Sequence, residues 1–187
     1  MYIAVRRLFI SALVLAFCTW PLQCATLERL SLDDMIAKST AIVRGKVTSS
    51  YAAYSGRVIY THYAIQVSES LKGGSRSAVD LAVPGGAVDH LRQTVAGAPE
   101  FRTGDEYVFF LWTGRSGLTQ VIGLTQGLFS IAPGTSADPL ATRPSSGELM
   151  LARGSGAPVK NETLAMRVSE LRSRIAATLA AAGSAAK

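Results

Sequence analysis

The spacing of apolar residues changes early in the chain and predicts a short helix followed by strands. Ser31 is a predicted helix cap, because Asp34 follows three residues later and Leu30 and Met35 have the spacing of a hydrophobic staple. Beyond Ser39 the apolar period falls from about 3.6 residues to about 2. We therefore expect the helix to end near Ser39 and a strand to begin directly after it.

Two strands joined by a tight turn form the first predicted hairpin. Residues 41–49 alternate between apolar and polar side chains, with Val43 and Val47 on the apolar face. The turn falls at Ser55 and Gly56, and the next strand carries Ile65 on its core face. This pattern is typical of a half-buried antiparallel pair.

Further strands are predicted by short apolar segments at regular spacing. They cover residues 79–83, 107–112, 118–122 and 128–131. The run Tyr107 to Trp112 is apolar without interruption, which indicates a strand covered on both faces. Short strands without alternating helices predict a mainly β fold, namely a small antiparallel OB-like β-barrel with a short N-terminal helix and a C-terminal amphipathic helix.

The connection after residue 84 is long for a small barrel. It has weak periodicity, apart from a possible short strand at Thr94 and Val95, and its candidate binding residues are Gly85, Gly86, Arg92, Pro99 and Phe101. Long ordered connections often carry binding sites. The competing interpretation is a strap that packs Phe101 over the mouth of the barrel.

The C-terminal third changes in composition. Residues 133–160 are rich in Pro, Gly and Ser and predict a flexible surface linker. Asn161 is the predicted start of a helix whose apolar residues recur at steps of three and four, namely Leu164, Val168, Leu171, Ile175 and Leu179. This apolar stripe either covers the end of its own barrel or docks a partner.

The first 25 residues have the order of a secretory signal peptide. Arg6 and Arg7 precede an apolar run over residues 8–20, and small residues follow up to Ala25. We expect a secreted or periplasmic protein without a transmembrane span after signal removal, and lipid anchoring at Cys24 is the alternative. The predicted organisation is a signal peptide at 1–25, a barrel domain at 26–132, a linker at 133–160, and a helix and tail at 161–187.

Composition fits one compact exported body. The chain is 48% hydrophobic and 17% charged, which suits a globular domain. Both cysteines, Cys18 and Cys24, lie in the predicted signal peptide, so the exported part has no thiol. Without residues 1–25 the chain keeps 17 basic and 13 acidic residues, and this small excess does not predict a nucleic-acid groove.

The first hairpin also resembles a known domain. Residues 40–49, 60–67 and 69–73 resemble the first hairpin of the netrin-like domain, the OB-type barrel shared by the tissue inhibitors of metalloproteinases, and residues 104–111 resemble its closing strand. Three further motifs are Pro-Gly-Gly at residues 84–86, Gly-Ala-Pro-x-Phe at 97–101 and Gly-x-x-x-x-x-Phe-Leu at 104–111. By these motifs the whole chain resembles a group of uncharacterised secreted bacterial proteins. The resemblance implies a scaffold of this kind and no more. Inhibition through an N-terminal cysteine is not implied, because no cysteine follows Cys24.

Candidate catalytic and metal-binding residues are few. His62 and His90 are the only histidines, and neither belongs to a metal-binding motif, so no metal or cofactor is predicted. Asp89 is placed to orient His90 as a base, but no motif supplies a nucleophile. Our hypothesis is an exported non-catalytic binding module that contacts an extracellular protein, such as a protease, through the loop of residues 84–101. The alternatives are a hydrolase that uses His90 and a lipid-anchored structural envelope protein.

Overall fold

A computed structural model describes residues 26–134, 136–145 and 147–185 of the chain. The predicted signal peptide and Cys24 lie outside these residues. The strands are β1 (Thr26–Glu28), β2 (Ala41–Ser55), β3 (Val58–Lys72), β4 (Ala78–Pro84), β5 (Gly86–Val88), β6 (Leu91–Gln93), β7 (Glu106–Thr113), β8 (Thr119–Val121), β9 (Leu128–Ile131), β10 (Leu140–Arg143), β11 (Leu149–Leu151), β12 (Pro158–Val159) and β13 (Leu164–Arg167). The helices are α2 (Leu32–Lys38) and α3 (Val168–Ala185).

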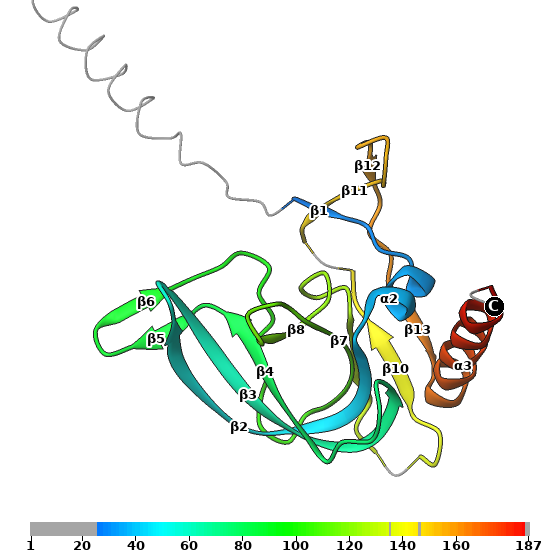
Figure 1. Ribbon diagram of the computed structural model, residues 1–187, viewed down its shortest axis with the longest axis horizontal. Coiled ribbons are helices and arrows are strands. Elements are labelled where there is room, and N and C mark those ends of the chain that lie inside the picture. Colours follow the sequence, from blue (N-terminus) through cyan, green and yellow to red (C-terminus); the bar gives the residue numbers. More distant parts are fainter. Residues whose placement is uncertain (1–25, 135, 146, 186–187) are drawn as a thin grey trace, which may run out of the picture.

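One curled antiparallel sheet dominates the fold (Figure 1). Its strand order is β13-β10-β9-β7-β2-β3-β4, and β8 pairs with β7 beside this path. Strands β5 and β6 form a separate hairpin, and β1, β11 and β12 form a small sheet in which β1 and β11 are parallel. The predicted mainly β class with two helices is confirmed.

Strand β7 separates two apolar cores, because successive side chains of a strand point to opposite faces. Val108 and Phe110 belong to the outer core, which also contains buried residues of α2 and α3. Phe109 and Leu111 belong to the inner core, inside the curl formed with β2, β3 and β4. The predicted strand with both faces covered is therefore confirmed.

The sheet curls without closing. Strands β2 and β3 pair through three register shifts, and such bulges strengthen the twist of a pair. Some Cα atoms of β4 and β8 lie within 8 Å of one another. Among the described residues, however, no strand pairing joins β4 to β8. The predicted closed barrel is therefore not observed.

The predicted helix cap is confirmed in detail. Ser31 Oγ accepts a hydrogen bond from the backbone N–H of Asp34 at 3.0 Å, and Asp34 Oδ2 accepts one from the N–H of Ser31 at 3.4 Å. Helix α2 then runs to Lys38, with Ser39 as its C-terminal cap. Met35 and Ile36 are fully buried in the outer core.

The C-terminal third differs from the prediction. Residues 133–160 contain three strands, and β10 lies between β9 and β13 in the large sheet. The helix begins at Val168 instead of Asn161, and Leu164 belongs to β13, which pairs with β10. The stripe along α3 packs into the outer core through Val168, Leu171 and Ile175.

Candidate functional site

The predicted binding loop leaves the sheet at two glycines with left-handed backbones. Gly85 and Gly86 have φ angles of +107° and +138°, which side-chain-bearing residues rarely adopt. The backbone N–H of Gly85 donates to Ile59 O at 2.8 Å, and Thr61 Oγ1 donates to Gly85 O at 2.9 Å. A Cβ atom on Gly86 would lie only 2.6 Å from Thr61 Oγ1. Glycine is thus required for the loop to fold back onto β3.

The loop contains a hairpin that the sequence pattern did not predict. Strands β5 and β6 pair antiparallel, and their turn holds Asp89, with a φ angle of +52°, and His90. Gln93 fastens the hairpin to β3, because its Oε1 accepts a hydrogen bond from the N–H of Ile59 at 2.9 Å. The possible strand at Thr94 and Val95 is wrong, since β6 ends at Gln93.

The end of the loop is anchored by an aromatic ring. Phe101 is 9% exposed and lies in the inner core. Its ring is edge-on to Tyr63, with centroids 4.9 Å apart, and to Tyr107, with centroids 5.3 Å apart. Pro99 is buried as well. The strap interpretation therefore describes the packing of Phe101 correctly. This residue anchors the end of the loop in the inner core.

The structure brings all five predicted binding residues to one hollow of about 340 Å³, which they line together with Thr61. Their exposure differs, since Arg92 is exposed whereas Phe101 is buried. Within the described part of the chain, no carboxylate lies within ion-pair distance of Arg92. The guanidinium of Arg92 can therefore donate hydrogen bonds to a ligand in this hollow.

A second hollow, of about 140 Å³, adjoins the first and was missed by sequence reasoning. It lies between β4 and β8 and is lined by Trp112, Val121, Leu124 and Pro84. Trp112 is 44% exposed although it ends the apolar run of β7. Leu124 has a φ angle of +57°, an unfavourable backbone for leucine. The feature of the sequence that could have indicated this hollow is the tryptophan at the end of the apolar run of residues 107–112.

The two histidines lie on different elements, namely β3 and the β5–β6 turn. His62 Nδ1 lies 2.9 Å from Asp80 Oδ2, and its ring stacks on Tyr51 with centroids 4.9 Å apart. His90 occupies the exposed turn of the β5–β6 hairpin. Among the residues that the structure describes, no three His, Cys, Asp or Glu side chains gather as metal ligands would.

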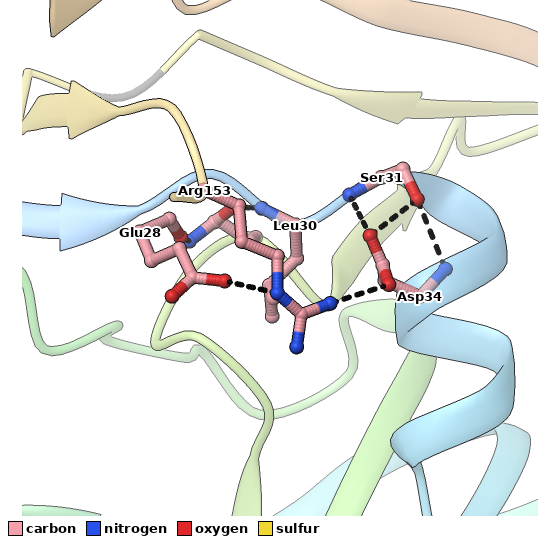
Figure 2. A network of polar contacts seen from close by, with 6 residues as sticks. Glu28, Leu30, Ser31, Asp34 and Arg153 are labelled. Carbon is pink, nitrogen blue, oxygen red and sulfur yellow. Dashed lines mark hydrogen bonds and ion pairs between the residues drawn. The ribbon is translucent and has the colours of Figure 1, made fainter. Parts of the chain in front are cut away.

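The chain has two pairs of adjacent acidic residues, Asp33 with Asp34 and Asp105 with Glu106, and both have structural partners. Figure 2 shows Arg153 between two carboxylates, 3.3 Å from Glu28 Oε1 and 3.3 Å from Asp34 Oδ1. The hydrogen bond from Ser31 is the main cause that lowers the pKa of Asp34 below its usual value. Arg153 thereby joins the small sheet to the start of α2, and the prediction that Asp34 serves the helix terminus is confirmed.

The second acidic pair lies beside β2. Glu106 Oε1 accepts a hydrogen bond from Arg44 Nε at 2.7 Å. The Tyr107 hydroxyl donates to Asp105 Oδ2 at 3.2 Å, and burial is the main cause that raises the pKa of Tyr107 to about 12. Both carboxylates are thus engaged in holding β7 and the turn before it.

Comparison with known proteins gives no relative: no protein-family model, no curated protein and no solved structure matches the chain. In the described ranges, neither α2 nor α3 has the length and apolar composition of a membrane-crossing helix. A functional assignment for this chain therefore depends on the geometry of its own residues.

Proposed function

We propose that the protein is an exported, non-catalytic binding module that contacts a protein partner, such as an extracellular protease, through residues 84–101. The observation that carries this proposal is the hollow that Gly85, Gly86, Arg92 and Pro99 share. Because Phe101 anchors the loop in the inner core, the loop presents a preformed surface. Preformed surfaces bind with a smaller entropic cost than flexible ones.

The scaffold is proposed to be an OB-like barrel, as the netrin-like resemblance implies. Support comes from the curl of β2, β3, β4, β7 and β8 around the inner core. In such scaffolds the strands provide a rigid frame and the loops carry recognition. The unpaired gap between β4 and β8 is the part in which this chain departs from a closed barrel.

Recognition through this loop is tested by affinity capture. The tagged full-length protein is expressed in the organism that naturally produces it. Its partners are crosslinked to it and then recovered through the tag. We expect a partner that the wild type and Arg57→Ala retain, whereas Arg92→Ala loses most of it, since exposed arginines often dominate interfaces. Arg57 is the matched control, because it is an exposed arginine at the β2–β3 turn. Equal retention by all three proteins would contradict the proposed surface.

Export is tested on the same material by mass spectrometry of the mature N-terminus. Cleavage after Ala25 would give a chain that begins at Thr26, the first residue of β1. A lipid-modified Cys24 would instead favour the anchored alternative, and an intact Met1 would contradict export.

Absence of catalysis is tested with a fluorophosphonate probe for serine hydrolases. We expect no labelling of the wild type, because His90 lies in the exposed turn of the β5–β6 hairpin, where solvent surrounds its imidazole. Labelling that disappears in His90→Ala would establish the hydrolase alternative.

A further inference from the structure

The second hollow has the size and lining of a site for one apolar side chain. Its volume of about 140 Å³ is well below the roughly 300 Å³ at which sites for whole small molecules begin. Val121, Leu124 and Pro84 form apolar walls, and the exposed ring of Trp112 lies beside them. Aromatic and apolar surfaces of this kind gain free energy when they exclude water.

Backbone strain also lies at this hollow. The φ angle of +57° strains the backbone of Leu124, so the fold around this residue must hold it in place. Leu124 belongs to the turn between β8 and β9, in which Gln126 is buried and accepts a hydrogen bond from the N–H of Leu30 at 2.8 Å. The turn is thereby fixed, and so is the wall that it gives to the hollow.

The two hollows are neighbours with a common wall. Val83, Pro84 and Pro99 line both of them. A single segment of a partner that crosses this wall would therefore enter both hollows. In an extended chain, side chains two residues apart lie on one face at a separation of about 7 Å, which allows nearby residues of one segment to reach both.

Charge indicates what the larger hollow would hold. Arg92 is exposed and has no ion-pair partner among the described residues, and a guanidinium binds carboxylates with two parallel hydrogen bonds. Glu100 lines the same hollow. Glu100 is exposed, and its negative charge repels further carboxylates, so we expect the partner segment to place one carboxylate at Arg92.

We propose that the Trp112 hollow binds one apolar side chain of an extended partner segment, whose carboxylate a few residues away binds Arg92. This inference rests on the proposed function and names the chemistry of the partner at that surface. It adds a recognition site formed by Pro84, at the start of the loop that the sequence indicated, and by Trp112 and Leu124, which lie outside that loop.

The first test is a selection from a random peptide library displayed on phage, with the full-length protein immobilised. We expect enriched peptides that carry an aliphatic residue or a proline within about four positions of Asp or Glu. No enrichment, or enriched peptides without this pair, would overturn the inference.

The second test measures the affinity of one enriched peptide, fluorescently labelled, by anisotropy. Trp112→Ala should weaken binding about tenfold or more, as loss of an aromatic anchor does. Tyr54→Ala is the matched control, because Tyr54 is 46% exposed and Trp112 is 44% exposed. Tyr54→Ala should leave the affinity within about twofold. Thermal melting of each variant verifies that it is folded.

The carboxylate is tested by pairing variants of both molecules. Replacing the acidic residue of the peptide by its amide should weaken binding to the wild type and have little further effect on Arg92→Ala. Additive effects of the two changes would show that the carboxylate binds elsewhere.

Failure of this inference is distinguishable from failure of the proposed function. If the captured partner is lost with Arg92→Ala but retained in full with Trp112→Ala, the loop binds the partner and the apolar site is wrong. If no partner depends on Arg92, the proposed function itself fails.

Discussion

Phe101 illustrates at the scale of one residue how the loop depends on the core. Its ring contacts Tyr63 and Tyr107, and replacing it by alanine would leave a cavity among them. We expect Phe101→Ala to lower the free energy of unfolding by about 3–5 kcal/mol, measured by urea denaturation. Tyr54→Ala, at a 46% exposed position, should change it by less than about 1 kcal/mol. A similar small loss for both variants would mean that Phe101 is dispensable for packing.

Gly86 is a second residue at which local geometry fixes the loop. Gly86→Ala adds a Cβ at 2.6 Å from Thr61 Oγ1 and at 3.2 Å from Ile59 Cγ2, in addition to backbone strain. We expect a loss of about 2–4 kcal/mol in the free energy of unfolding, from strain and overpacking together. Gly56→Ala is the matched control, because Gly56 also has a positive φ angle, +62°, but has nothing within 4 Å. It should cost only about 1 kcal/mol.

Thr61 gives a further check on this reasoning. In a Thr61→Ala background the closest contact of the new Cβ is removed, so Gly86→Ala should cost less there than in the wild type. An equal cost in both backgrounds would show that the contact with Thr61 does not contribute to the effect.

Residues of the site were predictable to different degrees. Gly85 and Gly86 signal a backbone that other residues rarely adopt, and the length of the loop indicated Arg92 as well. Trp112 was read as part of a covered strand, because the sequence does not show that the sheet curls and stays unpaired beside β8. The positive φ angle of Leu124 could not be predicted from its residue type, since leucine seldom adopts such an angle.

At the scale of the elements, both helices begin at carboxylates. Asp34 belongs to the capping box of α2, and Asp138 accepts hydrogen bonds from the N–H and the hydroxyl of Ser169 at the start of α3, at 2.9 and 2.6 Å. The local cap could be predicted from residues three positions apart. The cap of α3 could not, because Asp138 lies 31 residues before Ser169 in a segment whose composition indicated a linker.

These caps predict an acid-dependent loss of stability. Hydrogen bonds from Ser31 and Ser169 lower the pKa of Asp34 and of Asp138 below the usual 3.8. A carboxylate with a lowered pKa in the folded state contributes stability above its unfolded pKa, and the contribution is lost as the pH falls through the folded value. The double variant Asp34→Asn, Asp138→Asn should be less stable than the wild type at pH 7, measured by thermal melting.

The difference between the two proteins should shrink as the pH falls below about 3.8, where the wild-type carboxylates become protonated. A matched control is Asp89→Asn, in the exposed β5–β6 turn. A difference that persists unchanged down to pH 2 would mean that the carboxylate charges do not stabilise the helices.

The apolar pattern predicted the strands correctly where one or both faces are buried. It failed where a strand is fixed by pairing with a segment that lies far away in the sequence. Strands β2, β3, β4, β7 and β9 follow the apolar period of the sequence. Strand β13 was assigned to the helix, because Leu164 lies four residues before Val168 and so also fits the apolar spacing of the helix that follows. Pairing with β10 decides the conformation of this segment, and that contact is invisible in a local pattern.

At the scale of the whole molecule, α3 closes the outer core. Val168, Leu171 and Ile175 are 3%, 1% and 1% exposed, and they pack with buried residues of α2, β7 and β9. Arg172 Nε also donates to Glu69 Oε1 at 2.7 Å, which joins the helix to β3. The apolar stripe is therefore used within the molecule, and the alternative that it docks a partner is not supported.

Removal of α3 tests this role. Burial of three aliphatic side chains contributes roughly 5–9 kcal/mol, which is comparable to the whole stability of about 5–15 kcal/mol for a typical domain. A chain that ends at Arg167 should therefore lose its cooperative thermal transition and its near-ultraviolet circular dichroism. A chain that ends at Leu179 keeps the three buried residues and is the matched control, with a melting temperature within a few degrees of the wild type. If the shorter chain melts as the wild type does, the stripe is free, and docking of a partner by α3 becomes the better explanation of its apolar face.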